Sequence, residues 1–209
     1  MLYIIPGFPF ITSGIDLAKL DLRSGIERLT YSIIIVLTAT IFAWIMALLL
    51  NLQPEEFTTL NISPLLHLIL RLITSFCGVF GFSIMFNSPI PMALIAALIG
   101  AVANTLRLEL IDFTQMPAAI AAFIGAVAAG LLASVIKQYN GYPRISLTVP
   151  SIVIMVPGLY LYRAIYNFGI MSLTDAVSWF TSAVLIITAL PLGLIFARII
   201  TDKTFRYCT

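Results

Sequence analysis

The stretch TVPSIVIMVPGLYLYRAIYNFG, Thr148–Gly169, is apolar enough to cross a membrane, yet it contains Pro150 and the pair Pro157-Gly158. Proline removes a backbone donor and clashes with the preceding helical turn, so the pair predicts a helix break at membrane depth. Lipid cannot satisfy the polar backbone groups that such a break exposes. We therefore expect protein, water or a ligand to contact them.

The composition of the whole chain predicts an integral membrane protein surrounded by a lipid bilayer. Hydrophobic residues make up 61% of the 209 residues and charged residues 10%, which is more apolar surface than one soluble core hides. The net charge of +2 is small, and the basic residues cluster near the ends of apolar stretches. That distribution argues against nucleic acid as a partner.

Six apolar stretches are long enough to span a bilayer core of about 30 Å, which takes roughly 20 helical residues. They cover residues 29–50, 64–86, 90–106, 115–136, 147–166 and 176–200. The apolar stub at residues 1–12 would reach only about 18 Å and cannot span. We therefore predict an all-α fold, a polytopic transmembrane helical bundle of about six spans.

The distribution of lysine and arginine predicts the orientation, because basic residues stay on the cytoplasmic side. Alternating the spans leaves Arg107 and Arg163 on one side, with Arg71 buried or near that face. The other side holds Lys19, Arg23, Arg28, Lys137, Arg144, Arg198, Lys203 and Arg206. The sequence thus predicts a multi-pass protein of the cell inner membrane with both termini in the cytoplasm.

The segment Ser13–Leu29 places apolar and charged residues at helical spacing, which predicts an amphipathic helix at the cytoplasmic interface. Its charged side is either a solvated face or part of a gate. In the fourth stretch, by contrast, alanine, glycine and serine recur at every fourth position in two parallel rows. Small rows let helices approach closely, so that stretch is expected to be a core helix.

A weak internal repeat appears when the chain is shifted by 151 positions, which places Pro6-Gly7 on Pro157-Gly158. In both places an acidic linker and a long apolar stretch follow. The intervening number of spans is odd, which would invert one copy relative to the other, as in the inverted repeats of secondary transporters. We therefore expect residues 1–56 to be the tail of a first repeat, and residues 57–209 to be a second repeat of five transmembrane helices.

The helix segment after Pro157 and Gly158 is the first candidate for a substrate site, because its free amides and positive dipole end suit a carboxylate. Pro6 and Gly7 would be the equivalent break in the other repeat. A purely structural kink is the alternative, since helical bundles tolerate proline.

Arg71 lies well inside an apolar stretch and shares a helix face with His67, Thr74 and Gly78. An arginine at such a depth is expected to face a cavity or a partner, so Arg71 and Thr74 are candidate substrate-binding residues. The alternative is that Arg71 extends to the outer interface and His67 lies at headgroup level.

Two further polar groups are candidates for the substrate path. Asn104 and Arg107, followed by Glu109 and Asp112, form either a charged outer vestibule or a polar cluster that ends the third span. Arg163, with the tyrosines around it, lines either an exit path or an aromatic belt at the interface.

Motifs that would indicate an enzyme or a pump are missing from the sequence. It contains no GxxxxGK[ST] phosphate loop and no GxSxG or HExxH motif. His67 is the sole histidine, and the two cysteines lie in an apolar run and in the polar tail, which does not suit a metal. We expect no catalytic residues, no metal and no cofactor, and transport driven by an ion, a proton or the substrate's own gradient.

Three stretches resemble the threonine/serine exporter family. IIPGFPFITSGIDLAKLDLRSGIERL is similar to the end of the amino-terminal half of that family. GVFGFSIMFNSPIPMALIAALIGAVANTLRLEL, residues 78–110, and Thr148–Gly169 are similar to the carboxy-terminal half. Members of the family have two five-span halves in one chain or in two subunits. The resemblance therefore implies a fragment or a split protein, and as partner a separate amino-terminal half or a second copy of this chain.

The resemblance also implies the function: export of small hydrophilic metabolites by alternating access, with threonine and serine as the expected substrates. Some two-subunit relatives export dicarboxylates such as succinate, so a dicarboxylate exporter is one alternative. A membrane scaffold that transports nothing is another.

Overall fold

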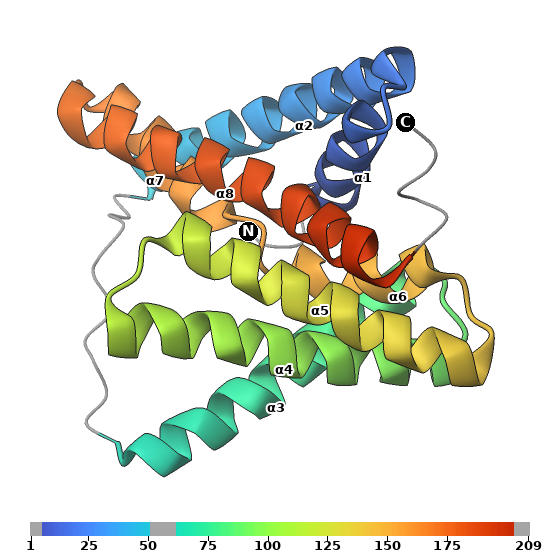
Figure 1. Cartoon of the computed structure of the whole chain (residues 1–209). Helices are drawn as coiled ribbons and strands as arrows, with labels where there is room; N and C mark the ends of the chain where they lie inside the picture. The colour runs from blue at the N-terminus through green and yellow to red at the C-terminus, as the bar shows by residue number, and fades with distance from the viewer. Residues whose placement is uncertain (1–5, 51–61, 203–209) are drawn as a thin grey trace.

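The computed structural model describes residues 6–50 and 62–202, and within these ranges the regular structure is helical (Figure 1). Helices α1 and α2 precede the gap. The helices in chain order are α1 Gly7–Ala18, α2 Leu22–Leu49, α3 Pro64–Met85, α4 Ile90–Thr114, α5 Ala118–Asn140, α6 Arg144–Val153, α7 Gly158–Gly169 and α8 Leu173–Thr201. The predicted all-α fold is therefore confirmed.

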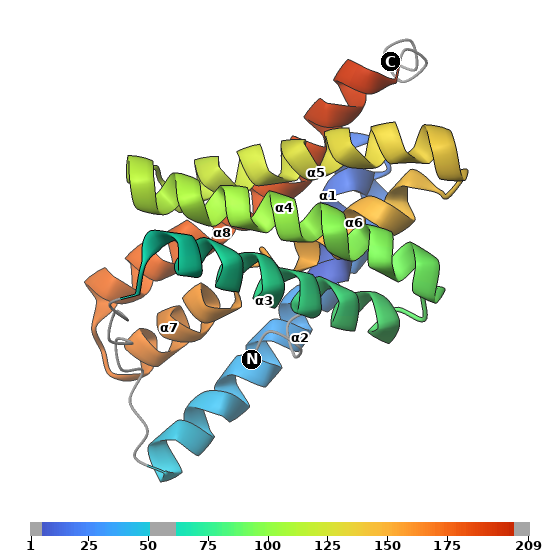
Figure 2. The ribbon, with the colours of Figure 1, turned by 90° about the horizontal axis from the view of Figure 1, so that it is seen from below.

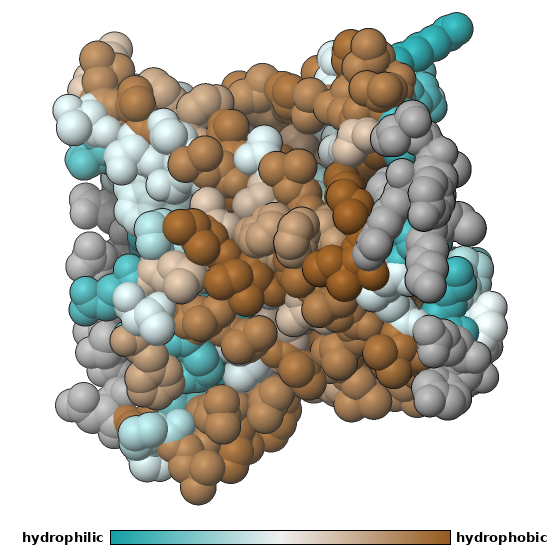
Figure 3. Space-filling view, viewed as in Figure 1, coloured by the Kyte–Doolittle hydropathy of each residue, from teal (hydrophilic) through white to brown (hydrophobic). Residues whose placement is uncertain are grey.

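Within the described residues, five helices, α2, α3, α4, α5 and α8, are long and apolar enough to cross a membrane, and the bent pair of α6 and α7 brings the number to six if the pair is one broken span. The spacing agrees with the six apolar stretches of the sequence. Figure 3 shows hydrophobic side chains over the middle of one face and hydrophilic ones toward its left and right ends. A belt of this kind is expected of a multi-pass bundle whose outer surface faces lipid.

The helix break predicted at Pro157-Gly158 is present. α6 ends at Val153, α7 begins at Gly158, and the two helices are bent by 44°. Pro157 caps α7 without an amide of its own to donate, and both Pro157 and Gly158 are buried. Pro150 lies inside α6 without interrupting it.

α4 continues past the predicted end of the third span at residue 106 and reaches Thr114. The charged residues of its last turns do not end the helix, because Glu109 and Asp112 both pair with Arg71 of α3. The left-handed residue Gln115, with φ of 50°, ends the helix instead, and Pro117 precedes α5. Arg107 thus lies within a helix rather than in a loop.

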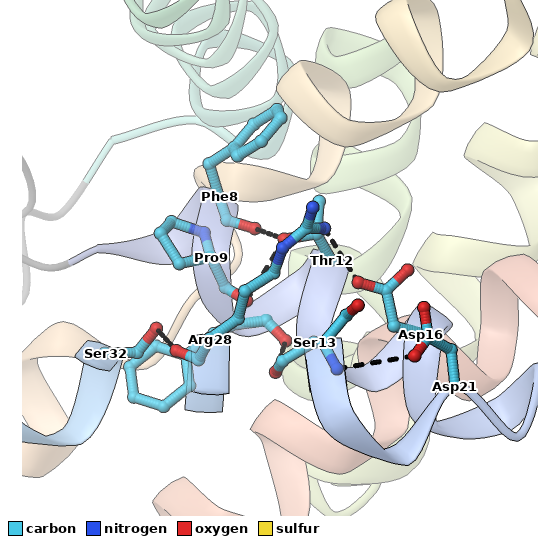
Figure 4. A network of polar contacts seen from close by, with 10 residues as sticks. Phe8, Pro9, Thr12, Ser13, Asp16, Asp21, Arg28 and Ser32 are labelled. Atoms are coloured by element: carbon cyan, nitrogen blue, oxygen red, sulfur yellow. Dashed lines mark hydrogen bonds and ion pairs between the residues drawn. The ribbon is translucent and has the colours of Figure 1, made fainter. Parts of the chain in front are cut away.

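The single amphipathic helix predicted over Ser13–Leu29 is wrong. The chain turns at Leu20, whose φ is 63°, and Asp21 accepts a hydrogen bond from the Ser24 amide at the start of α2. Arg28 then donates to Asp16 at 2.7 Å across the turn (Figure 4). These contacts make α1 and α2 a helical hairpin, in which part of the predicted interfacial segment packs inside the protein.

The small-residue helix predicted from the sequence is confirmed as a core element. α5 packs chiefly against α8 and also against α4 and α6. Its fully buried alanines are Ala121, Ala122, Ala126, Ala129 and Ala133. A Cβ atom on Gly193 of α8 would lie 2.7 Å from the Phe123 carbonyl oxygen, so the absence of a side chain there permits the close approach.

The hairpin of α1 and α2 packs against the rest of the bundle in two places, α1 against α8 and α2 against α7. Gly14 of α1 faces Pro191 of α8, and a Cβ atom at this glycine would be 2.4 Å from the proline ring. α2 lies beside α7 (Figure 2), where Gly169 faces the ring of Trp44.

Gly169→Ala is expected to weaken this second attachment, because the added Cβ atom would lie 2.1 Å from the Trp44 ring. Overpacking of this kind costs about 1 kcal/mol when a side chain can turn aside, which lowers the melting temperature by a few degrees. Thermal unfolding of the purified chain in detergent measures the effect. Ile170→Val, on the exposed neighbour, is the control, and an equal melting temperature for both variants would contradict the packing.

Candidate functional site

Arg107 reaches from α4 to the break between α6 and α7. Its Nη1 atom donates to the carbonyl oxygen of Met155 at 3.2 Å, and Met155 lies within the break. The same atom is 3.5 Å from the Asn104 Oδ1 atom, one turn earlier in α4. A backbone acceptor freed by the break is thus satisfied by a cation from another helix, as the proline pair led us to expect.

The guanidinium of Arg107 still has donor capacity. Its Nε atom is buried and has no hydrogen-bond partner among the described residues. Within the same residues Arg107 forms no ion pair with a carboxylate, whereas Arg71 has two such partners. A cation buried without a counter-charge is costly, and at membrane depth such a residue usually serves a ligand or an ion path.

Other polar side chains lie close to Arg107. Asn104 is buried and its Nδ2 atom donates to the Ser75 Oγ atom of α3 at 2.9 Å. The hydroxyl of Thr105 is buried without a partner in the described part of the chain. The break therefore adjoins a small polar cluster between α3 and α4, defined here as Ser75, Asn104 and Arg107, inside an otherwise apolar bundle.

α5 packs directly against Arg107 and Met155 at Gly125, because glycine has no side chain to keep the helices apart. A Cβ atom at Gly125 would lie 3.2 Å from the Arg107 Cβ atom and 3.3 Å from the Met155 sulfur. Met155 is itself fully buried. These packing contacts hold the break and the arginine in one fixed arrangement.

Each of the two Pro-Gly pairs starts a helix beside the break between α6 and α7. Pro157 caps α7 with φ −81° and ψ 58°, and Pro6 caps α1 with φ −74° and ψ 66°. Gly7 lies against the break, since a Cβ atom there would be 3.0 Å from the Val156 side chain. The first turns of α1 and α7 leave N–H groups without intrahelical partners, and their dipoles favour negative charge.

Arg71 and Thr74 lie away from the break. Arg71 donates to Glu109 at 2.8 Å and also to Asp112, which fastens α3 to the last turns of α4. Thr74 is exposed and donates to the Leu70 carbonyl oxygen of its own helix at 2.8 Å. This neutralised cation is less suited to a substrate carboxylate than Arg107.

Arg163 lies on α7, with its guanidinium carbon 4.7 Å from the ring centroid of Trp179 in α8. Tyr160 contacts the same tryptophan edge-on at 5.2 Å between ring centroids. Of the predicted site residues, the structure therefore brings Pro157, Gly158, Asn104, Pro6 and Gly7 together at the break, and leaves Arg71, Thr74 and Arg163 outside it.

Arg107 was visible in the sequence as one turn from Asn104, but its pattern equally fitted a polar cluster at the end of a span. The charged residues that follow it suggested a helix end. What places Arg107 in the bundle is the continuation of α4 to Thr114, which depends on ion pairs with a different helix. The pattern of residues along α4 alone cannot reveal ion pairs with α3.

Comparison with known families decides the class of protein. A family model described as "Threonine/Serine exporter, ThrE" matches residues 71–200, which is more than half of the chain. The chain belongs to the threonine/serine exporter family. A second model, "Putative threonine/serine exporter", matches residues 1–51, the part that contains α1 and α2. No curated protein and no solved structure matches the chain.

Membership of the threonine/serine exporter family makes this chain a multi-pass membrane exporter with a small-molecule substrate. The family is one of transporters rather than enzymes. The polar cluster lies in α3 and α4 and the break lies between α6 and α7, all within the longer matched segment.

Proposed function

We propose that the chain exports threonine, serine and similar small amino acids by alternating access, and that the substrate binds at the break between α6 and α7. The observation that carries the proposal is the position of Arg107. This half-buried cation contacts the Met155 carbonyl oxygen at the break, and it has no carboxylate partner among the described residues.

The chemistry of the site suits a zwitterion. The substrate carboxylate would bind the Arg107 guanidinium and the amides of the first turn of α7, which begins at Pro157-Gly158. Its ammonium group would bind oxygen acceptors such as the Met155 carbonyl and the Asn104 amide.

One cavity supports a route to the site from the end of the bundle where α3 gives way to α4. It has a volume of about 550 Å³ and lies between α1, α4 and α6. Phe8 and Pro9 of α1 line it beside the start of that helix, and Pro150 of α6 lines the opposite wall. We assign this end to the cytoplasm, so the cavity would be the entrance.

The remaining candidate residues belong to the outer part of the proposed route. Arg71 with Glu109 and Asp112 would hold the outer ends of α3 and α4 together, and Thr74 lies one turn deeper. Arg163 on Trp179 would fasten α7 to α8 at the same level. Opening toward the outside would require α7 to move relative to these contacts, with the break as the hinge.

The proposal retains the inverted repeat over residues 1–56 and 57–209. Two matched pairs of helices support it: α1 and α7 each have 12 residues and a proline cap, and each precedes a long helix, α2 or α8. We propose an inner-membrane location with both termini in the cytoplasm, coupling to an ion or proton gradient, and a partner that is a separate amino-terminal half or a second copy.

A dicarboxylate such as succinate fits the site less well. It would need a second cation at the break, and in the hydrogen bonds of the described residues Arg107 is the arginine that donates there. The lone cation therefore favours a substrate with one carboxylate.

The test is efflux of labelled threonine and labelled succinate from cells that express the chain, alone and together with an amino-terminal half of the family. We expect efflux of threonine that unlabelled serine reduces and unlabelled succinate does not. Preferential efflux of succinate would replace the substrate. If neither solute moves although both proteins reach the membrane, the chain is a scaffold and the proposed transport is wrong.

A further inference from the structure

Four cations surround a single cavity at the basic end of the bundle. The cavity has a volume of about 330 Å³, and Lys19, Lys137, Arg144 and Arg198 line it together with one carboxylate, Asp202. They come from the end of α1, the end of α5, the start of α6 and the end of α8, on the right of Figure 1. None of these residues belongs to the cluster at the break.

The preference of basic residues for the cytoplasmic side explains why these side chains lie at the same end of the bundle. It does not explain why four of them, on four helices, converge on one cavity with a single acidic residue. Like charges around a shared cavity repel, and a bound anion would relieve that repulsion.

Arg144 shows that the site is already organised. Its Nη1 atom donates to the Thr201 Oγ1 atom at 2.8 Å, and its Nη2 atom donates to the Gly130 carbonyl oxygen at 3.0 Å. Both acceptors are neutral, and they fix the orientation of the guanidinium. Asp202, which pairs with Arg198 at 3.7 Å, is the one carboxylate of the lining that offsets the charges of the four cations. Thr201 is held in turn by Ser134, at 3.2 Å between the two hydroxyl oxygens.

Apart from Thr148, the rest of the lining is apolar, with Ile15, Ile145, Leu194 and Ile195 as its walls. The first turn of α6 also faces the cavity through Arg144, Ile145 and Thr148, and the N-terminal end of a helix adds positive potential. A cationic rim over apolar walls matches an amphiphilic anion: a phosphate headgroup with a hydrocarbon chain beside it.

We propose that this cavity binds the phosphate group of an anionic membrane phospholipid, with the phosphate among the four cations and an acyl chain along the isoleucine and leucine wall. The bound lipid would contact α1, α5, α6 and α8 at once. It would therefore fix the start of α6, the half-helix that leads to the break, against the core of the bundle.

The test is thermal unfolding of the full chain in detergent as phosphatidylglycerol is added, compared with phosphatidylcholine and with inorganic phosphate. The double variant Lys19→Gln/Lys137→Gln removes two exposed cations of the cavity. Arg23→Gln is the matched control, because Arg23 is an exposed cation at the same end that pairs with Glu27 and does not line the cavity.

We expect phosphatidylglycerol, but not phosphatidylcholine, to stabilise the wild type. The double variant should need roughly 10- to 30-fold more phosphatidylglycerol for the same stabilisation, and Arg23→Gln should need no more than the wild type. Two results would contradict the proposal. If inorganic phosphate stabilises the wild type as much as phosphatidylglycerol does, the ligand is not a lipid.

If the wild type, the double variant and Arg23→Gln all need the same amount of phosphatidylglycerol, the lipid does not bind in this cavity. If the double variant fails to fold, Lys137→Gln alone, with bound lipid counted by native mass spectrometry, decides between the same outcomes.

Discussion

Arg107→Gln is expected to reduce efflux of labelled threonine by about 30-fold or more. It would remove the cation of the proposed pair between Arg107 and the substrate carboxylate, and loss of one partner of such a desolvated pair costs about 2–5 kcal/mol. Glutamine can still donate to the Met155 carbonyl oxygen, which Arg107 contacts at 3.2 Å. It removes the positive charge and the second donor that would hold a carboxylate. The structural bond at the break can thus persist while substrate binding is lost.

The measurement compares efflux per molecule of protein in the membrane for the wild type, Arg107→Gln and Arg107→Lys. Lysine keeps the charge but not the planar fork, so its efflux should lie between the other two. Arg23→Gln is the control for loss of an exposed cation. Melting temperatures in detergent detect misfolding. Efflux by Arg107→Gln at the wild-type rate, from a folded protein, would remove Arg107 from the substrate site.

Pro157→Ala is expected to reduce threonine efflux at least about tenfold while leaving the stability of the protein equal or higher. Pro157 caps α7, and a proline at this position would cost about 3 kcal/mol inside one continuous helix, a cost that alanine does not carry. Alanine restores an amide donor and removes the ring, so α6 and α7 can move from their 44° bend toward one continuous helix. A continuous helix would satisfy the carbonyl groups that now face Arg107. A loss of efflux without a loss of stability is expected if the break serves the substrate site, whereas a purely structural kink should not show this combination.

Pro191→Ala provides the matched control for that prediction, because Pro191 is a buried proline inside α8, which continues without interruption from Leu173 to Thr201. We expect Pro191→Ala to retain more export than Pro157→Ala. Circular dichroism and melting temperature confirm that both variants fold. If Pro157→Ala exports as the wild type does, the break is a packing feature and the substrate binds elsewhere.

Several features of the fold followed from local pattern in the sequence. A transmembrane helix shows itself as a run of apolar residues, and a proline followed by glycine inside such a run favours a break, so the apolar spans and the interruption before Gly158 were predictable. The alanine rows of α5 were likewise predictive, since small side chains on one face identify a helix that others approach closely.

Features that depend on a second helix did not follow. The predicted amphipathic helix over Ser13–Leu29 overlooked the turn at Leu20, because nothing in its periodicity shows that α1 folds back into the bundle. The third span was predicted to end at residue 106, yet Glu109 and Asp112 continue it by pairing with Arg71 of α3. The sequence favoured Arg71 as a candidate cation because it lies inside an apolar stretch, whereas in the structure Arg71 pairs with two carboxylates and Arg107 donates to the break.

The amino-acid sequence by itself determined the class of protein, the number and order of its spans, and the position of the break, because each depends on residues that are neighbours along one helix. The tertiary structure decided which cation reaches that break. It neutralised Arg71 with two carboxylates and placed Arg107 within hydrogen-bond distance of the Met155 carbonyl oxygen. The physical reason is that the environment of a charge is set by the helices packed around it, and these come from distant parts of the chain.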